Sequence, residues 1–508
     1  MLEAAPEHPV PSRGDRVTTP TATKYETVIG LEVHIQLNTH SKMFCACDRQ
    51  YFDAEPNSHV CPVCLGMPGM LPVINQEAVT STLLAGLALG CDIPAYAKFD
   101  RKNYPYPDLM KGYQISQFDQ PFCLNGVLEI DVEGERRLVH LERIHLEEDT
   151  ARLLHRDNGI ETYSLLDVNR AGSPLMELVT KPDMHTALEA HAFLRTLRQV
   201  MRYLRIADAD MDKGGMRCDA NVSLRPVGQE ELGRKVEVKN MNSFRSVQRA
   251  IEFEIERQTK MLDAGERIVQ ETRGYVDATG ETVSQRSKEE ASDYRYFPEP
   301  DLPPLHIAPE TIEALQAKLP ELPAARLTRF QSQYGLTAAE ARILSDSRSD
   351  GDAFEEAVSI AGTEHAKTVA HWFTGDVAKH LNTLGAEAEL SDTKVTARHI
   401  GELVRLAASN AVTAATAKEV LDIAFETGEL PEAIVDARGL RQVTDAGAID
   451  EVAQQAIAAN PKAVEDYRGG KQSAIGFLVG QVMREMKGRA DANAAADTLR
   501  RHLDAAGG

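Results

Sequence analysis

Strict alternation of apolar and polar residues marks the segment Val28–Leu37 as a β-strand, because successive side chains of a strand point to opposite faces. Its apolar residues share one face: Leu31, Val33, Ile35 and Leu37. Glu32, His34 and Gln36 share the other face, with successive members ~6.6 Å apart. A strand with an apolar back and a Glu/His front is either exposed surface or one wall of a site.

The same alternation predicts two strands, 217–225 and 235–239, that pair as a hairpin across a turn-rich loop. The polar front of this hairpin carries Arg217, Asn221, Arg225, Lys235 and Lys239. Asn242 or Ser243 is expected to cap a following helix, whose buried stripe includes Phe244, Val247, Ile251, Ile255 and Met261. A basic front of this kind either holds phosphates or is a solvated sheet face, and composition does not decide between them.

Two further predicted strands carry isolated charged groups. One places His145 and Glu147 on one side and Glu148 on the other, and the second places Glu177 inside the apolar run Leu175–Val179. A lone charge in such a run is costly unless it is paired or bound to a metal. Carboxylates with an imidazole suit Mg²⁺ or Mn²⁺, and the alternative is a set of salt-bridged or solvated carboxylates.

Beyond the proline-rich stretch Phe297–Pro304 the pattern changes to a helical period. We therefore predict an α+β domain at 25–300, a helical domain at 301–394 and a second helical domain at 395–508. The polar, Pro- and Thr-rich extension 1–24 is predicted to be disordered. One helical stripe in the second helical domain comprises Ile475, Leu478, Val479, Val482 and Met486.

Composition limits the classes of function. The chain has 508 residues, of which 43% are hydrophobic and 26% charged, as in globular proteins. A formal net charge of −21 argues against non-specific coating of nucleic acid, although a local basic patch can still bind a shaped RNA. The most apolar run, 78–91, is too short to span a membrane, and the N-terminus shows no signal peptide. We expect a cytoplasmic protein.

Four of the seven cysteines are clustered as Cys45-x-Cys47 and, after thirteen residues, Cys61-Pro-Val-Cys64. Two chelating pairs brought together by a loop are typical of a tetrahedral zinc site. Four thiolates leave no open position for water, so such a zinc is structural. Buried free thiols are the alternative.

The sequence contains neither a Walker A motif nor a dinucleotide-binding fingerprint. The only similar stretch, Gly469-Gly470-Lys471, is followed by Gln472 and lacks the hydroxyl of a P-loop. Lys471, Arg484, Lys487 and Arg489 surround the helical stripe of the second helical domain and form either an RNA-facing patch or a solvated helix end.

Several longer segments together resemble one family, the B subunit of the bacterial glutamyl/aspartyl-tRNA amidotransferase. They are 29–34 (IGLEVH), 99–104 (FDRKNY), 113–121 (YQISQFDQP), 145–149 (HLEED), 167–170 (DVNR), 217–221 (RCDAN), 238–243 (VKNMNS) and 293–300 (DYRYFPEP). The resemblance extends from Tyr25 to the C-terminus.

This resemblance implies a heterotrimer with an A subunit that releases ammonia from glutamine and a small C subunit. The B subunit would use ATP to phosphorylate the side-chain carboxylate of Glu-tRNA(Gln) or Asp-tRNA(Asn), and ammonia would then displace the phosphate. The expected fold is a mixed α/β cradle followed by helical domains, the last of which contacts tRNA.

The resemblance also implies roles for individual residues. It assigns Mg²⁺ to His34, Glu148 and Glu177, with Glu32 and Glu147 nearby as further catalytic candidates. It assigns contacts with the phosphate or carboxylate to Arg217, Arg225 and Lys239, of which Arg217 and Lys239 are also catalytic candidates. It assigns tRNA contacts to Lys471, Arg484 and Lys487. A non-catalytic zinc-containing tRNA-binding scaffold and a metal-dependent hydrolase using Glu32, His34 and Glu177 remain alternatives.

Overall fold

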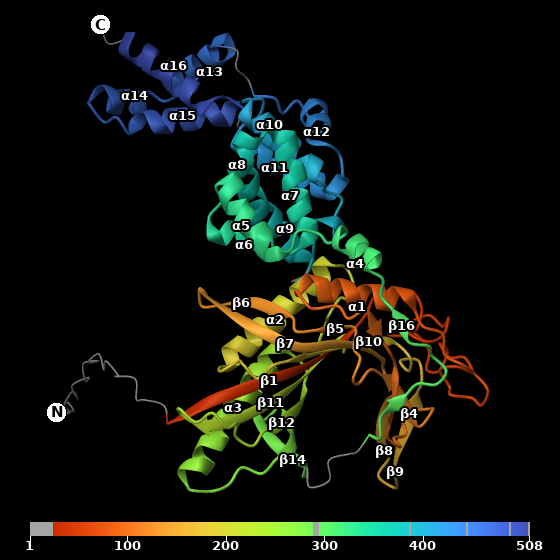
Figure 1. Cartoon of the computed structure of the whole chain (residues 1–508). Coiled ribbons are helices and arrows are strands. Elements are labelled where there is room, and N and C mark those ends of the chain that lie inside the picture. The colour runs from red at the N-terminus through yellow and green to blue at the C-terminus, as the bar shows by residue number, and fades with distance from the viewer. Residues whose placement is uncertain (1–23, 288–293, 386–387, 443–445, 487–488, 506–508) are drawn as a thin grey trace, which may run out of the picture. The chain divides into compact units, whose positions relative to one another are not determined.

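A nine-stranded mixed sheet forms the frame of the first of two compact units, Met1–Lys318 and Leu319–Gly508 (Figure 1). The computed structural model describes residues 24–287, 294–385, 388–442, 446–486 and 489–505. Apart from Lys24, the extension predicted to be disordered lies outside the described residues. The strands of the sheet follow the order β14-β13-β12-β11-β1-β10-β7-β5, with β6 paired to β7.

The bounds of the first-unit elements follow in chain order. Strands are β1 (Tyr25–Gln36), β2 (Tyr96–Ala97), β3 (Asp100–Asn103), β4 (Tyr113–Ser116), β5 (Cys123–Leu124), β6 (Val127–Val132), β7 (Glu135–Glu148), β8 (Arg152–Asp157), β9 (Thr162–Asp167), β10 (Pro174–Thr180), β11 (Met216–Pro226), β12 (Val236–Met241), β13 (Glu271–Val276), β14 (Glu281–Ser287), β15 (Phe297–Pro298) and β16 (Leu305–His306). Helices are α1 (Gln76–Ala88), α2 (Ala187–Tyr203), α3 (Phe244–Asp263) and α4 (Pro309–Gln316).

The alternation seen in the sequence decides how β1 sits in the sheet. Its apolar side chains Leu31, Val33 and Ile35 are fully buried. Helix α3 packs on β11 and β12, and α2 packs on α3 and β6, so this side of the sheet is covered by helices (Figure 1). Glu32 and His34 therefore lie on the opposite face, which confirms the predicted division of the strand.

The predicted hairpin and helix are also confirmed. Strands β11 and β12 pair antiparallel, with an irregularity in register between Cys218 and Ala220. Ser243 is the N-cap of α3, because its hydroxyl accepts a hydrogen bond from the backbone N–H of Ser246 at 3.0 Å. Val247 and Ile251 on the predicted stripe are fully buried.

The proline-rich stretch that suggested a domain border belongs to the first unit. Its first residues form β15, which pairs with β3, and the residues directly after it form β16, which pairs with β2. Prolines are tolerated here because both strands are short and lie at sheet edges. Glu299 is held by Arg101 at 2.7 Å, and the border between the units falls after Lys318 instead of at residue 300.

The second unit is entirely helical in its described residues. Its α-helices are α5 (Pro323–Tyr334), α6 (Ala338–Leu344), α7 (Arg348–Ala361), α8 (Ala366–Trp372), α9 (Ala378–Leu384), α10 (Ala397–Ala408), α11 (Ala414–Thr427), α12 (Pro431–Ala437), α13 (Ala446–Ala459), α14 (Pro461–Arg468), α15 (Ala474–Glu485) and α16 (Ala492–Ala505). Short helical turns lie at Thr363–His365, Phe373–Val377 and Leu390–Asp392.

Two separate hydrophobic cores divide these helices. One runs from Phe330 to Val435 and the other from Ile449 to Leu503. The border predicted at 394/395 therefore falls inside the first core, which the apolar face of α10 completes with Ile400 and Leu403. Among the described residues, no helix combines the length and the apolar character that crossing a bilayer requires.

The half-buried carboxyl group of Asp350, near the start of α7, should make the stability of the fold depend on pH. Burial, followed by the charges of Glu389, Asp346 and Asp392, raises its pKa from 3.8 to about 6. Between pH 3.8 and 6 the folded protein binds more protons than the unfolded chain, so stability falls as the pH rises through this window. Asp350→Asn should therefore raise the free energy of unfolding by about 1–2 kcal/mol at pH 7.5.

Chemical denaturation of this variant and of the wild type at pH 4.5 and 7.5 measures the effect. Glu356→Gln, an exposed substitution on the same helix, is the control. A gain in Asp350→Asn that is equal at both pH values would contradict the assignment.

Candidate functional site

Four neighbouring strands place one polar row on the face of the sheet opposite the helices α2 and α3. In the register of the sheet, His34 of β1 lies opposite Arg217 of β11 and opposite Glu177 of β10. Glu177 in turn lies opposite His145 of β7. Directly opposed residues of paired strands point to the same face, so these four side chains converge although they are far apart in the sequence.

Glu147 joins this row and completes a group able to hold a metal ion. The Nε2 atom of His34 lies 3.5 Å from a Glu177 oxygen and 3.8 Å from a Glu147 oxygen. Ligand atoms of His34, Glu147 and Glu177 lie within 4.8 Å of one another. One imidazole and two carboxylates are a donor set that suits a divalent cation.

The opposite charges of the histidines and carboxylates in this group favour the ionised form of each. His145 Nε2 lies 3.0 Å from a Glu177 oxygen. Burial alone would lower the pKa of His145, but the nearby Glu177 and Glu147 raise it to about 9. Burial would raise the pKa of Glu177, but the two histidines hold it well below its usual range. Glu147 is fixed by a hydrogen bond of 2.9 Å from the Ser116 hydroxyl.

A second acidic group lies on the same face, next to the first. Ligand atoms of Glu32, Asp219 and Glu237 come within 4.8 Å of one another. Lys239 Nζ lies 2.6 Å from Asp219 and 3.1 Å from Glu237, so the structure places this predicted site residue among carboxylates. Glu32 and His34 are two residues apart on β1, so the two groups are ~6.6 Å apart along the strand.

Arg217 is held by Asp149, a residue that received no role in the sequence analysis. The distance from Arg217 Nη2 to Asp149 Oδ2 is 2.8 Å, and Gln36 donates a second hydrogen bond to the same oxygen at 2.7 Å. The charge of Arg217 opposes the effect of burial and keeps the pKa of Asp149 below its usual range. The sequence offered one indication of a role for Asp149, namely its position directly after Glu148.

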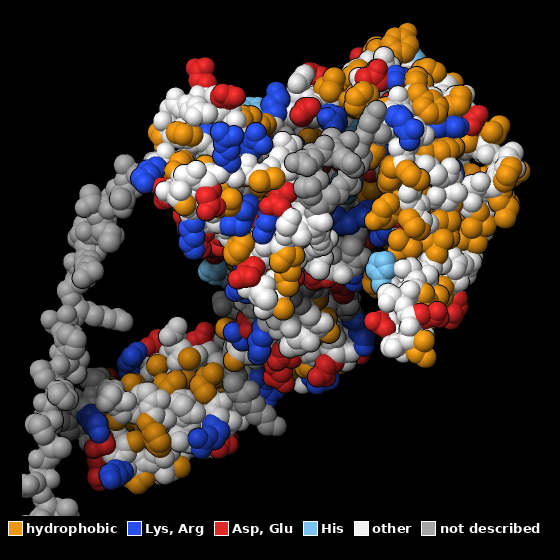
Figure 2. Space-filling view, turned by 90° about the horizontal axis from the view of Figure 1, so that it is seen from below, with side chains coloured by type: hydrophobic (Ala, Val, Ile, Leu, Met, Phe, Trp, Pro, Cys, Tyr) orange, Lys and Arg blue, Asp and Glu red, His pale blue; other side chains and the backbone are white. Residues whose placement is uncertain are grey.

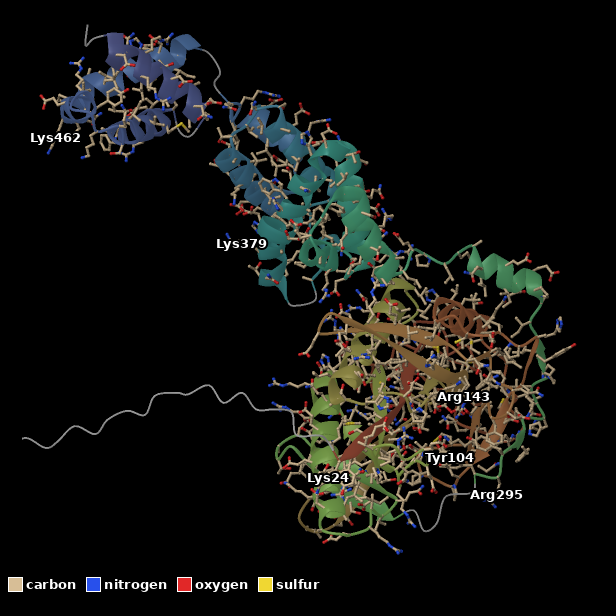
Figure 3. The ribbon with its side chains drawn as sticks, turned by 60° about the vertical axis from the view of Figure 1, so that its left-hand side comes forward. Lys24, Tyr104, Arg143, Arg295, Lys379 and Lys462 are labelled. Atoms are coloured by element: carbon tan, nitrogen blue, oxygen red, sulfur yellow. The ribbon has the colours of Figure 1, made fainter. Side chains whose placement is uncertain are left out.

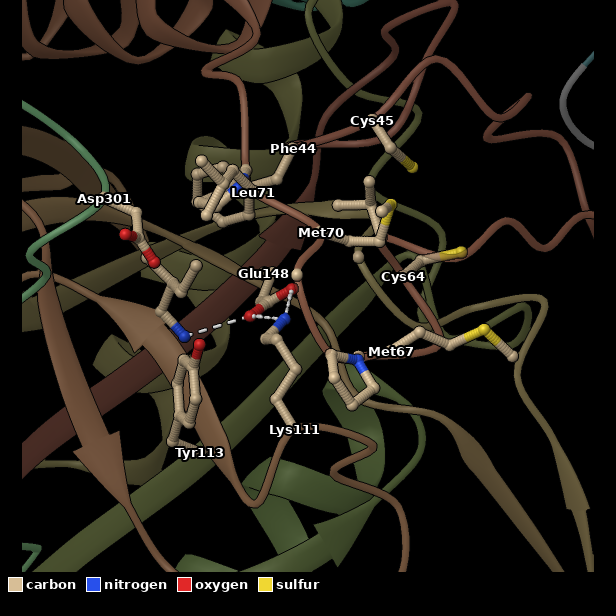
Figure 4. Close-up of a pocket in the computed structure, with 17 residues that line it drawn as sticks. Phe44, Cys45, Cys64, Met67, Met70, Leu71, Lys111, Tyr113, Glu148 and Asp301 are labelled. Carbon is tan, nitrogen blue, oxygen red and sulfur yellow. Dashed lines mark hydrogen bonds and ion pairs between the residues drawn. The ribbon is translucent and has the colours of Figure 1, made fainter.

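Glu148, the residue predicted to bind Mg²⁺ with His34 and Glu177, does not join them. It precedes Asp149 at the end of β7 and points to the opposite face from Glu147, because side chains alternate along a strand. Its carboxylate binds Lys111 Nζ at 2.5 and 2.7 Å and accepts a hydrogen bond from the Ile115 N–H at 3.0 Å (Figure 4). In the group that is able to hold a metal ion, Glu147 stands where Glu148 was expected.

The Glu148–Lys111 pair lines a cavity of about 250 Å³. Apolar side chains of the loop after the cysteine cluster, Met67, Met70 and Leu71, line another part of it (Figure 4). None of the residues that line this cavity belongs to the group formed by His34, Glu147 and Glu177.

Arg225 also lies apart from the row. It is opposite Glu26 on β1 and binds the Glu26 carboxylate at 2.8 Å. Glu26 is eight residues before His34 on the same strand, which corresponds to ~26 Å. The structure therefore does not bring this predicted phosphate contact to the group formed by His34.

The four clustered cysteines meet as the spacing predicts. Their sulfur atoms lie within 4.8 Å of one another, and the Sγ atoms of Cys61 and Cys64 are 3.9 Å apart. Tetrahedral zinc–sulfur bonds of 2.3 Å give sulfur–sulfur distances of about 3.8 Å. A hydrogen bond from Cys45 lowers the pKa of Cys64 to about 4. This cluster can bind a metal ion.

Comparison with known proteins identifies the family. The family model described as the GatB/GatE catalytic domain matches residues 27–313, which include all the groups on the sheet. The model described as the GatB domain matches residues 352–503 in the helical unit. The chain belongs to the GatB family.

Curated relatives of this GatB-family chain match over nearly their whole length. One from Dehalococcoides mccartyi is 54% identical over 490 residues, which cover 95% of this chain and 99% of the relative. One from Thermomicrobium roseum is 52% identical and covers 92% of this chain and 96% of the relative. Both bear the name of the B subunit of aspartyl/glutamyl-tRNA(Asn/Gln) amidotransferase.

The basic residues predicted to contact tRNA lie within the matched GatB domain. Arg484 is exposed on α15, and Lys471 is exposed near its start and lies 3.5 Å from Asp466. Lys487 lies outside the described residues. On the face seen in Figure 2, basic and acidic side chains are interspersed, in keeping with the negative net charge.

Proposed function

We propose that this chain phosphorylates the side-chain carboxylate of a misacylated tRNA, Glu-tRNA(Gln) or Asp-tRNA(Asn), within a tRNA-dependent amidotransferase. The relatives carry the name of the B subunit of that enzyme. The observation that carries the proposal is the group formed by His34, Glu147 and Glu177, with Arg217 directly beside it. Acidic metal-binding groups flanked by cations are what phosphoryl transfer requires, since the reaction brings anions together.

The proposed reaction has two steps. An oxygen of the substrate carboxylate forms a bond to the γ-phosphorus of ATP, and the bond from that phosphorus to the bridging oxygen breaks, so that ADP leaves. Ammonia then attacks the carbonyl carbon of the acyl phosphate. The carbon–oxygen bond to phosphate breaks, inorganic phosphate leaves, and loss of a proton from nitrogen gives the amide.

Residues of the sheet have separate tasks in the first step. His34, Glu147 and Glu177 would hold Mg²⁺, which supplies positive charge to the phosphate oxygens. Arg217, oriented by Asp149, presents its guanidinium to the phosphate or to the substrate carboxylate. Glu32, Asp219 and Glu237 form a second place where a divalent cation fits, and Lys239 neutralises their charge in its absence.

Other parts of the chain support this chemistry. We infer that the cysteine cluster holds structural zinc, because four thiolates at these distances complete a tetrahedral site. We also propose an A subunit that supplies ammonia, a small C subunit, and tRNA contacts by Lys471, Arg484 and Lys487. Such an enzyme of protein biosynthesis works in the cytoplasm.

The assembled amidotransferase with γ-labelled ATP and no ammonia source tests the proposal. ADP should form only when Glu-tRNA(Gln) or Asp-tRNA(Asn) is present, and hydroxylamine should trap the acyl phosphate. Normal tRNA binding without any ADP would favour the scaffold alternative. Metal-dependent hydrolysis by this chain alone, without ATP, would favour the hydrolase.

A further inference from the structure

Lys102 is a cation near the candidate metal group that the sequence analysis did not single out. It lies on β3, opposite Gln114 of β4. Gln114 donates a hydrogen bond to the Glu148 carbonyl at 2.7 Å, and Ser116, two residues further on the same face, donates one to the Glu147 carboxylate. This face of the β3–β4 pair is therefore turned toward the end of β7 that carries Glu147, and Lys102 shares it.

Aromatic rings from two segments form a cage beside the Lys102 ammonium, with Tyr104 on one segment and Tyr294 on the other. Its Nζ lies 4.9 Å from the ring centre of Tyr294 and 5.8 Å from that of Tyr104. The rings of Tyr294 and Tyr296 are 6.1 Å apart, and Tyr296 stacks on Phe118 at 4.5 Å. Aromatic faces attract a cation and limit the positions that its flexible stem can adopt.

The two segments that form this cage are joined by a backbone contact. The Asn103 backbone N–H donates a hydrogen bond to the Tyr294 carbonyl at 2.9 Å, and the Asn103 side-chain amide donates one to the Arg295 carbonyl at 2.9 Å. Figure 3 labels Tyr104 and Arg295, which lie at the same edge of the first unit. The cage is therefore part of the fold and does not depend on a single flexible loop.

Three neighbouring cations are paired with carboxylates, whereas Lys102 has no such partner within the part of the chain that the structure describes. Lys98 lies 2.5 Å from Asp100, Arg101 lies 2.7 Å from Glu299, and Lys111 lies 2.5 Å from Glu148. Among the described residues, no carboxylate oxygen is found within 4.0 Å of Lys102 Nζ. Within the described residues its N–H donors therefore have no carboxylate acceptor, which distinguishes it from the three paired cations.

Electrostatics also connect Lys102 with the metal group. Burial acts to lower its pKa, but the charges of Glu147 and Glu177 and the ring oxygen of Tyr296 outweigh burial and raise it. Lys102 therefore stays an ammonium at neutral pH, half-buried and close to the carboxylates that are proposed to hold Mg²⁺.

We propose that the Lys102 ammonium is a catalytic residue that binds the oxygens of the phosphoryl group during its transfer from ATP to the substrate carboxylate. This inference rests on the proposed function. In the transition state, charge is spread over the phosphoryl oxygens while one phosphorus–oxygen bond forms and another breaks. A fixed cation near the proposed metal ligands stabilises that charge more than the charge of the ground state.

Lys102→Met in the assembled enzyme tests the role directly. The kcat for tRNA-dependent ADP formation should fall by about 100-fold, while the KM for ATP stays within about threefold. Lys102→Arg keeps the positive charge and should recover at least about tenfold of that loss. A kcat within threefold of the wild type for Lys102→Met would overturn the inference, as would an effect confined to the KM for aminoacyl-tRNA, which would indicate a carboxylate-binding role.

The cage offers a second variant pair that leaves the lysine in place. Tyr294→Leu should lower kcat about tenfold because the ammonium loses an aromatic face, whereas Tyr294→Phe keeps the ring and should retain the wild-type rate. Wild-type kcat in both would contradict the inference even if Lys102→Met failed to fold. The same assay on the wild-type enzyme distinguishes failure of this inference from failure of the proposed function. If the wild type formed no tRNA-dependent ADP, the proposed function itself would be refuted.

Discussion

Glu147→Gln should abolish the ATP-dependent step and leave release of ammonia by the partner subunit intact. The substitution replaces a negatively charged ligand with a neutral amide, and the Ser116 hydroxyl can still bind the side chain. We expect tRNA-dependent ADP formation to fall by at least about 100-fold, and Mn²⁺ affinity of the chain to fall in parallel. Rapid-quench measurement of ADP and titration with Mn²⁺ quantify the two effects.

Two matched variants make this result specific. Glu142→Gln changes an exposed carboxylate on the same strand and should leave both quantities unchanged. Glu148→Gln disrupts the pair with Lys111 on the other face and should leave Mn²⁺ affinity unchanged. Loss of Mn²⁺ binding in Glu148→Gln with retention in Glu147→Gln would restore the ligand set predicted from the sequence and reject the one drawn from the sheet register.

The second large effect concerns the cysteine cluster. Cys64→Ser should remove about one zinc per chain and lower the free energy of unfolding by about 3–5 kcal/mol. The loss is smaller than the about 10–16 kcal/mol that zinc contributes in isolated zinc-finger peptides, because hydrogen bonds to Leu166 and Asn169 also hold this loop in place. Metal analysis and calorimetry measure the change.

A control for this prediction is Cys91→Ala, which removes a buried thiol outside the cluster. It should retain zinc and shift the thermal midpoint much less. If Cys64→Ser kept a full equivalent of zinc, the cluster would not be the metal site. An unchanged thermal midpoint together with loss of zinc would show that the metal does not stabilise the fold.

The positions of Glu147 and Glu148 show what the local sequence pattern can predict and what it cannot. Alternation along β7 separates these neighbours onto opposite faces, and the sequence alone revealed that separation. Which of the two meets His34 depends on the register between β7, β10 and β1. Register is set by pairing between separate segments, and β1 lies more than a hundred residues before β10, so a reading of each strand by itself could not determine it.

The same distinction explains Arg217 and Arg225. Both lie on the polar face of β11, and the sequence pattern did not distinguish them as candidates for a phosphate contact. Only Arg217 lies opposite His34. Arg225 is paired with Glu26 at the far end of the strand. In the helical unit, composition suggested a border at 394/395, whereas α10 packs into the core that precedes it because its apolar face is complementary to α7.

By itself the sequence determined the local features: the two faces of β1, the hairpin, the capped helix α3 and the four cysteines that meet. Each of these depends on residue spacing within a short segment, where the period of the backbone decides which side chains share a face. Only the tertiary structure decided which charged groups act together. The group of His34, Glu147 and Glu177, the support of Arg217 by Asp149 and the aromatic cage of Lys102 arise from long-range pairing, which burial of the whole sheet stabilises.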